Sequence, residues 1–348
     1  MTNNDQSNPW GDKQTEFFYQ LTPHVILDEI EKHTDFICTG RALALNSMEN
    51  RVYEVEIENP EAKTRSENFI IAKFYRPGRW SKEQILEEHQ FTKDLIDNEI
   101  PAVGPLSFND GSTLQEVTEG GIYFTLFPKK SGRSPSELSF EEYQRVGRLL
   151  GRMHAVGKSK TAPNRISINE KTYGLHHLDF LQKSKTIPFH LETPFLEIAQ
   201  KICNNANSQL QKLTYHRIHG DCHFGNLIHG SEGLFWVDFD DMLNGPAVQD
   251  LWLIMPGTHK NFPREWDALL KGYETMNSFD EASLRTSEIF RALRLIHFAG
   301  WIAKRWKDPA FPRAFPQFDS DRYWTELTID LTTQHRLIEA SKDVNGNF

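Results

Sequence analysis

The hydrophobic periodicity of this 348-residue chain changes from that of strands to that of helices near residue 128. Before that point, short apolar runs bounded by turn residues predict about five strands, at 42–45, 52–57, 69–75, 103–108 and 121–127. One helix at 81–96 interrupts these strands, and another at 19–31 precedes them. We therefore expect a small antiparallel sheet with a helix in the first part of the chain.

After residue 134, apolar residues recur mainly at helical spacing. Helices are predicted at 140–155, 195–212, 262–276, 281–306 and 321–339, with a short β interruption at 215–218, 227–229 and 234–237. Residues 128–134 contain Lys, Gly and Pro and form the candidate hinge. The pattern predicts an α+β protein with a β-rich lobe over 1–127 and a larger, mostly helical lobe over 135–348. Because ligands commonly bind at domain junctions, both halves are expected to contribute to a site.

Composition excludes several classes of protein. The net charge of -9, with no basic block, weighs against a general nucleic-acid binder. No run of about 18 apolar residues predicts a transmembrane helix, and the polar residues 1–7 lack the features of a secretory signal. Three separated cysteines, Cys38, Cys203 and Cys222, do not predict a disulfide framework. We therefore expect a cytoplasmic protein that binds neither nucleic acid nor membrane.

The strongest local pattern is HGDCHFGN at residues 219–226, followed by the predicted hairpin and Asp238. Protein kinases carry H-R-D-x-x-x-x-N and a metal-binding Asp on a following hairpin; here Gly220 replaces the Arg. Phosphoryl transfer requires an oriented hydroxyl and Mg²⁺ held against the phosphates. Asp221 can orient the hydroxyl and accept its proton. The side-chain oxygens of Asn226 and Asp238 are ligands that Mg²⁺ prefers.

Each of these residues also has a simpler structural interpretation. Asp221 could cap the amides of its own loop, and Asp238 could belong to a solvated acidic turn with residues 239–241. His219 is expected to pack the loop and to donate a hydrogen bond to neighbouring backbone. These alternatives stay open as long as the motif is considered alone.

A zinc site is a sharper alternative, because four side chains of zinc-binding type lie within residues 219–223. Structural zinc sites generally use a second, distant pair of ligands. No convincing second pair exists, since Cys203 is isolated and residues 176–177, both His, lie in an expected polar loop. The zinc interpretation is therefore less favoured than the kinase-like one.

The first lobe contains residues that could bind the phosphates of a nucleotide. Lys73 lies in an apolar strand, where its charge is costly unless it is used or reaches solvent. Glu87 and Glu88 follow on a helix, where adjacent side chains point about 100° apart, so one faces inward. We favour Glu88. The loop 46–50 between the first two strands contains no glycine, but its amides and the Ser47 hydroxyl could cap phosphates.

Several runs, taken together and in order, resemble the bacterial stress response kinase A family. These are serine/threonine kinases with an aminoglycoside phosphotransferase and choline kinase-like fold. The resemblance spans nearly the whole chain after the polar N-terminal residues. The matching runs are 46–47 and 49–53, 73–77 and 79–80, 84–91, 150–154, 219–223 and 225–226, 237–238 and 240–241, 244–247, 249–252 and 308–312.

The resemblance implies a protein-kinase-like two-lobed fold and an ATP- and Mg²⁺-dependent kinase that acts on a protein serine or threonine in a stress response. Asp250 resembles a carboxylate that braces the catalytic loop from the next helix. The roles implied for the other matched positions are catalytic base for Asp221, Mg²⁺ ligands for Asn226 and Asp238, phosphate contact for Ser47, and a phosphate-binding pair for Lys73 and Glu88.

Two alternatives remain for the activity. The same fold serves kinases of aminoglycosides, choline and homoserine, so the acceptor could be a small hydroxyl compound. A non-enzymatic pseudokinase would be expected to lack at least one of four residues, and all four are present: Lys73, Asp221, Asn226 and Asp238. The chain also lacks the D-F-G and A-P-E triplets, so it is not a standard protein kinase.

Overall fold

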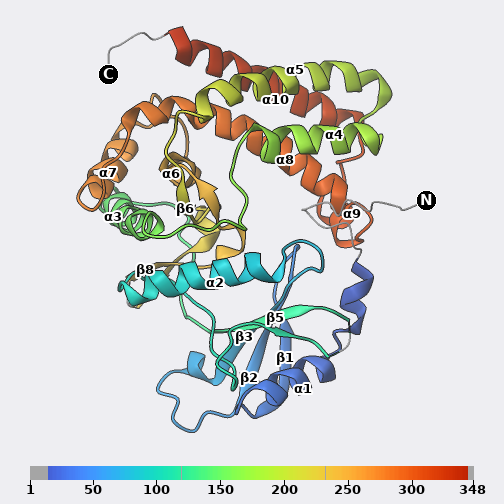
Figure 1. Ribbon diagram of the computed structural model, residues 1–348, viewed down its shortest axis with the longest axis vertical. Helices are drawn as coiled ribbons and strands as arrows, with labels where there is room; N and C mark the ends of the chain where they lie inside the picture. The colour runs from blue at the N-terminus through green and yellow to red at the C-terminus, as the bar shows by residue number, and fades with distance from the viewer. Residues whose placement is uncertain (1–14, 119, 232, 344–348) are drawn as a thin grey trace. The chain divides into compact units, whose positions relative to one another are not determined.

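The computed structural model describes residues 15–118, 120–231 and 233–343, and the chain divides into two units (Figure 1). The sheet unit runs to Glu137 and also takes in Phe224–Asp240. The helical unit consists of Leu138–His223 and the chain from Asp241 onward. The expected division at 128–134 placed the hairpin with the helices, whereas the hairpin groups with the sheet. The polar residues 1–14 lie outside the described residues.

The sheet unit is built on five antiparallel strands in the order β1-β2-β3-β5-β4, with a separate two-stranded hairpin, β7-β8. Its elements are α1 (Pro23–His33), β1 (Cys38–Ala44), β2 (Arg51–Ile57), β3 (Phe69–Phe74), α2 (Lys82–Asp97), β4 (Gln115–Glu116), β5 (Tyr123–Pro128), β7 (Leu227–Gly230) and β8 (Gly233–Trp236).

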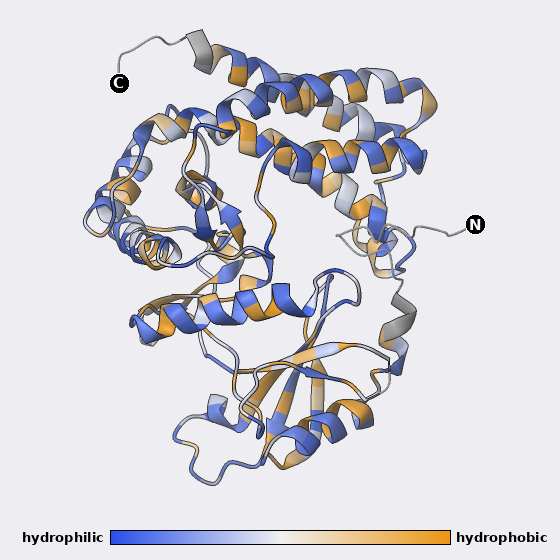
Figure 2. Cartoon of the chain, in the orientation of Figure 1, coloured by the Kyte–Doolittle hydropathy of each residue, from blue (hydrophilic) through white to orange (hydrophobic). Residues whose placement is uncertain are grey.

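Alternation along the strands gives the sheet two different faces. In β3, Ile70, Ala72 and Phe74 join a core that includes Ile26 and Ile30 of α1. The residues between them point to the opposite face, as the period of two in a strand requires. Figure 2 shows the resulting mixture of hydrophobic and polar residues along these strands. The face away from α1 therefore carries Lys73 together with the apolar side chain of Ile71.

The strand predicted at 103–108 is wrong. Ala102 forms only an isolated bridge, and the strand that completes the sheet is the two-residue β4. Pro101 and Pro105 lack the N–H that a strand ladder requires. Leu106 still donates its amide to Leu126, so this segment is extended without forming a strand.

The helical unit contains most of the helices and one short β ribbon, in which β6 pairs with β9. Its elements are α3 (Phe140–Gly157), α4 (His176–Lys183), α5 (Phe189–Leu210), β6 (His216–Ile218), β9 (Leu243–Gly245), α6 (Ala247–Ile254), α7 (Pro263–Glu274), α8 (Ser287–Arg305), α9 (Ala310–Ala314) and α10 (Asp321–Asp343).

Two expectations for this unit need correction. The helix expected at 281–306 is divided into a 3₁₀ segment, Glu281–Thr286, and α8. Residues 176–177, expected in a polar loop, begin α4, and His177 is buried. The apolar face of α4, which buries Leu178 and Leu181 one turn apart, explains why this segment is helical.

Nowhere in residues 15–118, 120–231 and 233–343 does a helix combine the length and apolarity needed to cross a bilayer.

Close packing of α3 against α7 generates the first prediction. A Cβ on Gly147 would clash with the backbone carbonyl of Leu269 and the backbone nitrogen of Tyr273. Alanine normally stabilises a helix interior relative to glycine by roughly 0.5–1 kcal/mol. Here the backbone clash should dominate, so Gly147→Ala is expected to destabilise the protein by about 1–3 kcal/mol.

Urea unfolding followed by circular dichroism measures this change. Arg145→Ala, at an exposed position of the same helix, is the control and should leave the unfolding midpoint nearly unchanged. A Gly147→Ala variant that is more stable than the parent would contradict the packing described for α3 and α7.

Candidate active site

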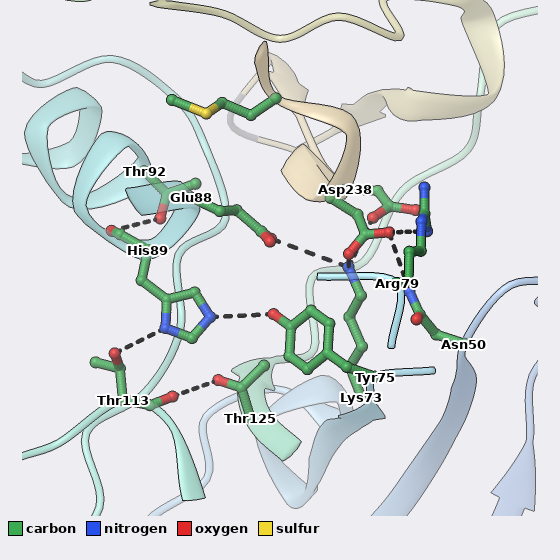
Figure 3. Close-up of polar contacts among 12 residues, drawn as sticks. Asn50, Lys73, Tyr75, Arg79, Glu88, His89, Thr92, Thr113, Thr125 and Asp238 are labelled. Carbon is green, nitrogen blue, oxygen red and sulfur yellow. Dashed lines mark hydrogen bonds and ion pairs between the residues drawn. The ribbon is translucent and has the colours of Figure 1, made fainter. Parts of the chain in front are cut away.

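Lys73 is a buried cation surrounded by carboxylates in the sheet unit. Its side chain is only 7% exposed, and its Nζ donates to Asp238 Oδ1 at 3.0 Å. Asp240 Oδ1 lies 3.2 Å from Nζ, and Glu88 Oε1 lies 3.9 Å away. Figure 3 shows Lys73 directed toward Glu88 and Asp238. The contact that the sequence favoured for Glu88 is therefore present, whereas the contact with Asp240 was not anticipated.

These carboxylates keep Lys73 charged. Burial by itself would lower the pKa of the ammonium group, but Asp238, Asp240 and Glu88 outweigh it and hold the pKa well above its usual value. Asp240 is itself buried and also forms an ion pair with Arg79. Lys73 is consequently a fixed positive charge on the sheet face that lies away from α1.

The helix α2 presents Glu88 through specific contacts at its start and along its inner face. Ser81 and Gln84 form a capping box that fixes where the helix begins. His89, the neighbour of Glu88, lies 3.0 Å from the Tyr75 hydroxyl and 2.8 Å from the Thr113 hydroxyl through its two ring nitrogens (Figure 3). These bonds connect α2 to the end of β3 and so fix the distance between Glu88 and Lys73.

The hairpin brings Asn226 and Asp238 to the same open end. Leu227 of β7 pairs with Trp236 of β8, and the Val237 amide donates to the Asn226 carbonyl at 3.0 Å. Asp238 follows with a φ of 58°, a conformation that costs a non-glycine residue about 1–3 kcal/mol and tends to occur at functional sites. Its side chain is 57% exposed, so the carboxylate can accept a further ligand besides Lys73.

Side chains hold the glycine-free loop at 46–50 in place. Arg76 donates from Nε to the Glu49 carbonyl at 2.9 Å and from Nη2 to the Met48 carbonyl at 3.2 Å. The Arg76 amide donates to Asn50 Oδ1 at 3.1 Å, and Asn50 Nδ2 donates to Asp240 Oδ2 at 3.2 Å. The loop is therefore linked to the same carboxylate that contacts Lys73.

Three of the predicted site residues line one cavity of about 350 Å³ in the sheet unit: Ser47, Lys73 and Asp238. This volume lies in the range of small-molecule sites, and several apolar side chains contribute to the walls. The other lining residues are Leu45, Asn50, Val52, Glu54, Ile71, Val103, Phe127, Pro128, Lys129, Lys130, Ile228, Phe235 and Val237. The cavity therefore combines apolar side chains with three lysines, at 73, 129 and 130, and with the carboxylates of Glu54 and Asp238.

The HGDCHFGN motif begins in the helical unit and is braced by a fully buried carboxylate. Asp250 Oδ2 accepts from the His219 amide at 2.9 Å, and Oδ1 accepts from the Gly220 amide at 2.8 Å. His154 Nε2 lies 3.1 Å from Oδ2. Gly220 has a φ of 84°, and a Cβ there would clash with the Asp241 carbonyl, which explains why glycine replaces the kinase arginine.

Asp221 follows this braced segment and has two cationic or potentially cationic neighbours. Arg294 Nη2 donates to Oδ1 at 2.8 Å, and His223 Nε2 lies 3.1 Å from Oδ2. Burial raises the pKa of Asp221, but the His223 hydrogen bond and the Arg294 charge outweigh burial and place it below the usual value. His219 Nδ1 accepts a hydrogen bond from the Asp221 amide at 3.3 Å.

The side chains at 219–223 do not fit a zinc site. Asp221 is engaged with Arg294 and His223, and the buried ring of His219 accepts from backbone. Cys222 is fully buried, and burial raises its pKa well above the ordinary value, which disfavours the thiolate that binds zinc. Across the described part of the chain, no group of three or more His, Cys, Asp or Glu is arranged to hold a metal ion.

The predicted residues are distributed over both units. Ser47, Lys73, Glu88, Asn226 and Asp238 belong to the sheet unit, and Asp221 belongs to the helical unit. Sequence reasoning missed four residues of this arrangement, namely Arg76, Arg79, Asp240 and Arg294. Asp240 could have been noticed from its position two residues after Asp238, but no local pattern marks Arg294.

The network around Asp240 yields a second prediction. Asp240→Asn would leave Lys73 and Arg79 buried with one carboxylate fewer, and breaking a buried ion pair typically costs about 3–5 kcal/mol. We therefore expect a loss of that size in the free energy of unfolding, measured by urea titration. Asp97→Asn, which removes an exposed partner of Lys93, is the control and should cost less than about 1 kcal/mol. Equal effects of the two variants would contradict the network.

Comparison with known proteins agrees with this geometry. A profile of the phosphotransferase enzyme family (APH) matches residues 42–286. Stress response kinase A of Escherichia coli strain K12 is 35% identical over 323 residues, which cover 92% of this chain and 95% of that protein. A Salmonella typhimurium strain LT2 protein named serine/threonine protein kinase RdoA is 33% identical, covering 92% of this chain and 94% of its own length.

Solved structures show the same fold. An amicoumacin kinase in complex with AMP-PNP, Ca²⁺ and Ami has a TM-score of 0.71 at 20% identity, covering 93% of this chain and 100% of its own. A microcompartment-associated aminopropanol kinase has a TM-score of 0.66 at 17% identity, covering 91% and 98%. These likenesses confirm the expected kinase-like α+β fold. Together with the profile match and the relatives, they show that this chain belongs to the phosphotransferase enzyme family, with the stress response kinase A proteins among its relatives.

Proposed function

We propose that this phosphotransferase transfers the γ-phosphate of ATP, with Mg²⁺, to a serine or threonine hydroxyl of a protein. The observation that carries the proposal is the cavity in the sheet unit. Its walls include Ser47, the fixed positive charge of Lys73 and the exposed carboxylate of Asp238. A triphosphate requires a cation and a metal-binding carboxylate of this kind, and its base requires an apolar surface.

The residues at the open end of the hairpin suit Mg²⁺. Mg²⁺ takes oxygen ligands, keeps several waters and is commonly bound by one or two carboxylates together with substrate phosphates. Asp238 would supply the carboxylate, and Asn226 would supply an amide oxygen. Bound there, Mg²⁺ would neutralise charge on the phosphates. The amicoumacin kinase of the same fold was solved with AMP-PNP and Ca²⁺, which agrees with a nucleotide and a divalent ion at such a site.

Asp221 would orient the acceptor hydroxyl. Its lowered pKa keeps the carboxylate ionised, so it can accept a hydrogen bond from the hydroxyl and take its proton late in the reaction. A low basicity is compatible with this role, because phosphoryl transfer depends mainly on positioning and electrostatics. The Asp250 brace would hold the preceding backbone and thereby the direction in which Asp221 points.

The class of acceptor rests on the relatives. The Salmonella relative is named a serine/threonine protein kinase, and it matches over more than nine-tenths of both chains. The solved kinases of small molecules match this chain at 20% identity or less, where the fold alone is comparable. A small-molecule hydroxyl kinase is the second candidate, because these structures share the fold.

One labelling experiment separates the two candidates. The protein is incubated with Mg²⁺ and γ-labelled ATP, and transfer to itself or to a generic protein acceptor is compared with transfer to aminoglycosides, choline and homoserine. We expect label on protein serine or threonine. Label on one of the small compounds alone would favour the second candidate, and nucleotide binding with no transfer to any acceptor would indicate a pseudokinase.

Removing the proposed base should separate binding from chemistry. Asp221→Asn is expected to leave Mg-ATP affinity within about threefold of the parent and to lower kcat by about 10²–10⁴-fold, the range of general-base effects. Calorimetry and initial rates measure the two quantities. Asp179→Asn, an exposed carboxylate of α4 paired with Lys183, is the matched control. Full activity in Asp221→Asn would refute this assignment.

Asp238→Ala should instead affect nucleotide binding. Loss of the proposed metal ligand should weaken Mg-ATP binding by about 10–100-fold, a range typical of disturbed metal sites. ATP titrated with excess EDTA provides the comparison, because affinity without metal should change much less. An unchanged affinity for Mg-ATP would exclude Asp238 as a metal ligand.

A further inference from the structure

We propose that Arg294 binds a negatively charged group beside the accepting hydroxyl, so that the enzyme prefers serine or threonine residues flanked by acidic side chains. This inference rests on the proposed function, because it assigns Asp221 to the acceptor hydroxyl. It adds the charge of the groups that flank the accepting hydroxyl, which neither the family nor the fold determines.

The geometry of Arg294 leaves donors available for a ligand. Arg294 lies on α8, and a single nitrogen, Nη2, donates to Asp221 Oδ1 at 2.8 Å. A guanidinium group carries five N–H donors in a fixed fork, and this side chain is 39% exposed. Within residues 15–118, 120–231 and 233–343, Asp221 is the one hydrogen-bond partner of Arg294. The remaining donors can therefore receive a carboxylate or phosphate next to the proposed base.

The neighbouring arginine differs from Arg294 because two of its donors, Nε and Nη2, are buried. Arg291 lies one turn earlier on α8, where its Nε is 3.5 Å from Glu288 Oε1 and its guanidinium carbon is 4.8 Å from the centre of the Trp252 ring. The charge of Arg291 is thus balanced by a structural partner. Arg294 is instead balanced by Asp221, whose other oxygen faces His223.

The charges that face Arg294 also bear on the choice of acceptor. Besides Asp221, the Asp241 carboxylate and the Tyr173 hydroxyl act on its charge, and each raises the pKa of the guanidinium. Arg294 remains a full cation beside the proposed base. A cationic acceptor such as an aminoglycoside or choline would have to approach it against repulsion, whereas an anionic group would form charge-assisted hydrogen bonds.

A peptide array tests the inference on the intact protein. Serine and threonine peptides carry Asp, Asn, Lys or phosphoserine at each flanking position, and kcat/KM is measured with Mg-ATP. We expect at least tenfold higher kcat/KM for Asp than for Lys at one or more positions, mainly through KM. The phosphoserine arm shows whether phosphate serves as well as carboxylate.

Variants at position 294 identify the residue responsible. Arg294→Gln should reduce the ratio of Asp to Lys peptides to within about threefold, and Arg294→Lys should retain part of it, because the charge remains while the fork is lost. Arg322→Gln, which removes an exposed arginine of α10 paired with Glu326, is the control and should keep the full ratio. Thermal melting confirms that each variant is folded.

The outcomes are distinguishable. Transfer without preference for charge, or a preference that Arg294→Gln leaves intact, overturns the inference while the proposed function stands. An equal fall in kcat for all peptides in Arg294→Gln also overturns it, because Arg294 would then only position Asp221. If no peptide accepts phosphate from the parent protein, the proposed function fails and the inference fails with it.

Discussion

The arrangement of the site in the sheet unit depends on the burial of one ammonium group, that of Lys73. Lys73 cannot lie on an apolar strand at 7% exposure unless its charge is compensated, because a buried unpaired charge is very costly. The compensation comes from Glu88 on α2 and from Asp238 and Asp240 beyond the hairpin. β3, α2 and the distant segment that follows the hairpin must therefore be assembled together. The same set then presents a fixed cation and an exposed carboxylate to one cavity.

In the helical unit, buried contacts hold in place the irregular loop at residues 219–223, which follows β6. A fully buried carboxylate, Asp250, accepts the amides of His219 and Gly220, and the left-handed Gly220 allows the chain to turn beside Asp241. Asp221 follows this braced segment, and Arg294 donates a hydrogen bond to its carboxylate. Members of one fold can differ in acceptor through a few such neighbours while the support stays the same.

Much of this could be predicted from local patterns. Alternation located β2 and β3, and the unusual lysine in an apolar strand pointed to Lys73. Long-range partners could not be predicted, since Asp240 and Arg79 are 161 residues apart and Arg294 is 73 residues from Asp221. The segment 103–108 is apolar like a strand but does not form one, because prolines beside and within it lack the N–H that a strand ladder requires. The helical start at residues 176–177 was missed because two histidines suggested a polar loop.

Calorimetric titration of Mg-ATP into the parent protein and Lys73→Met tests the central claim most directly. A charged hydrogen bond contributes about 1.5–3 kcal/mol, so the account predicts one nucleotide per parent chain and at least a roughly tenfold weaker affinity in the variant. Circular dichroism at the titration temperature establishes that both proteins are folded. Equal affinities, or no nucleotide binding by the parent protein, would contradict the account.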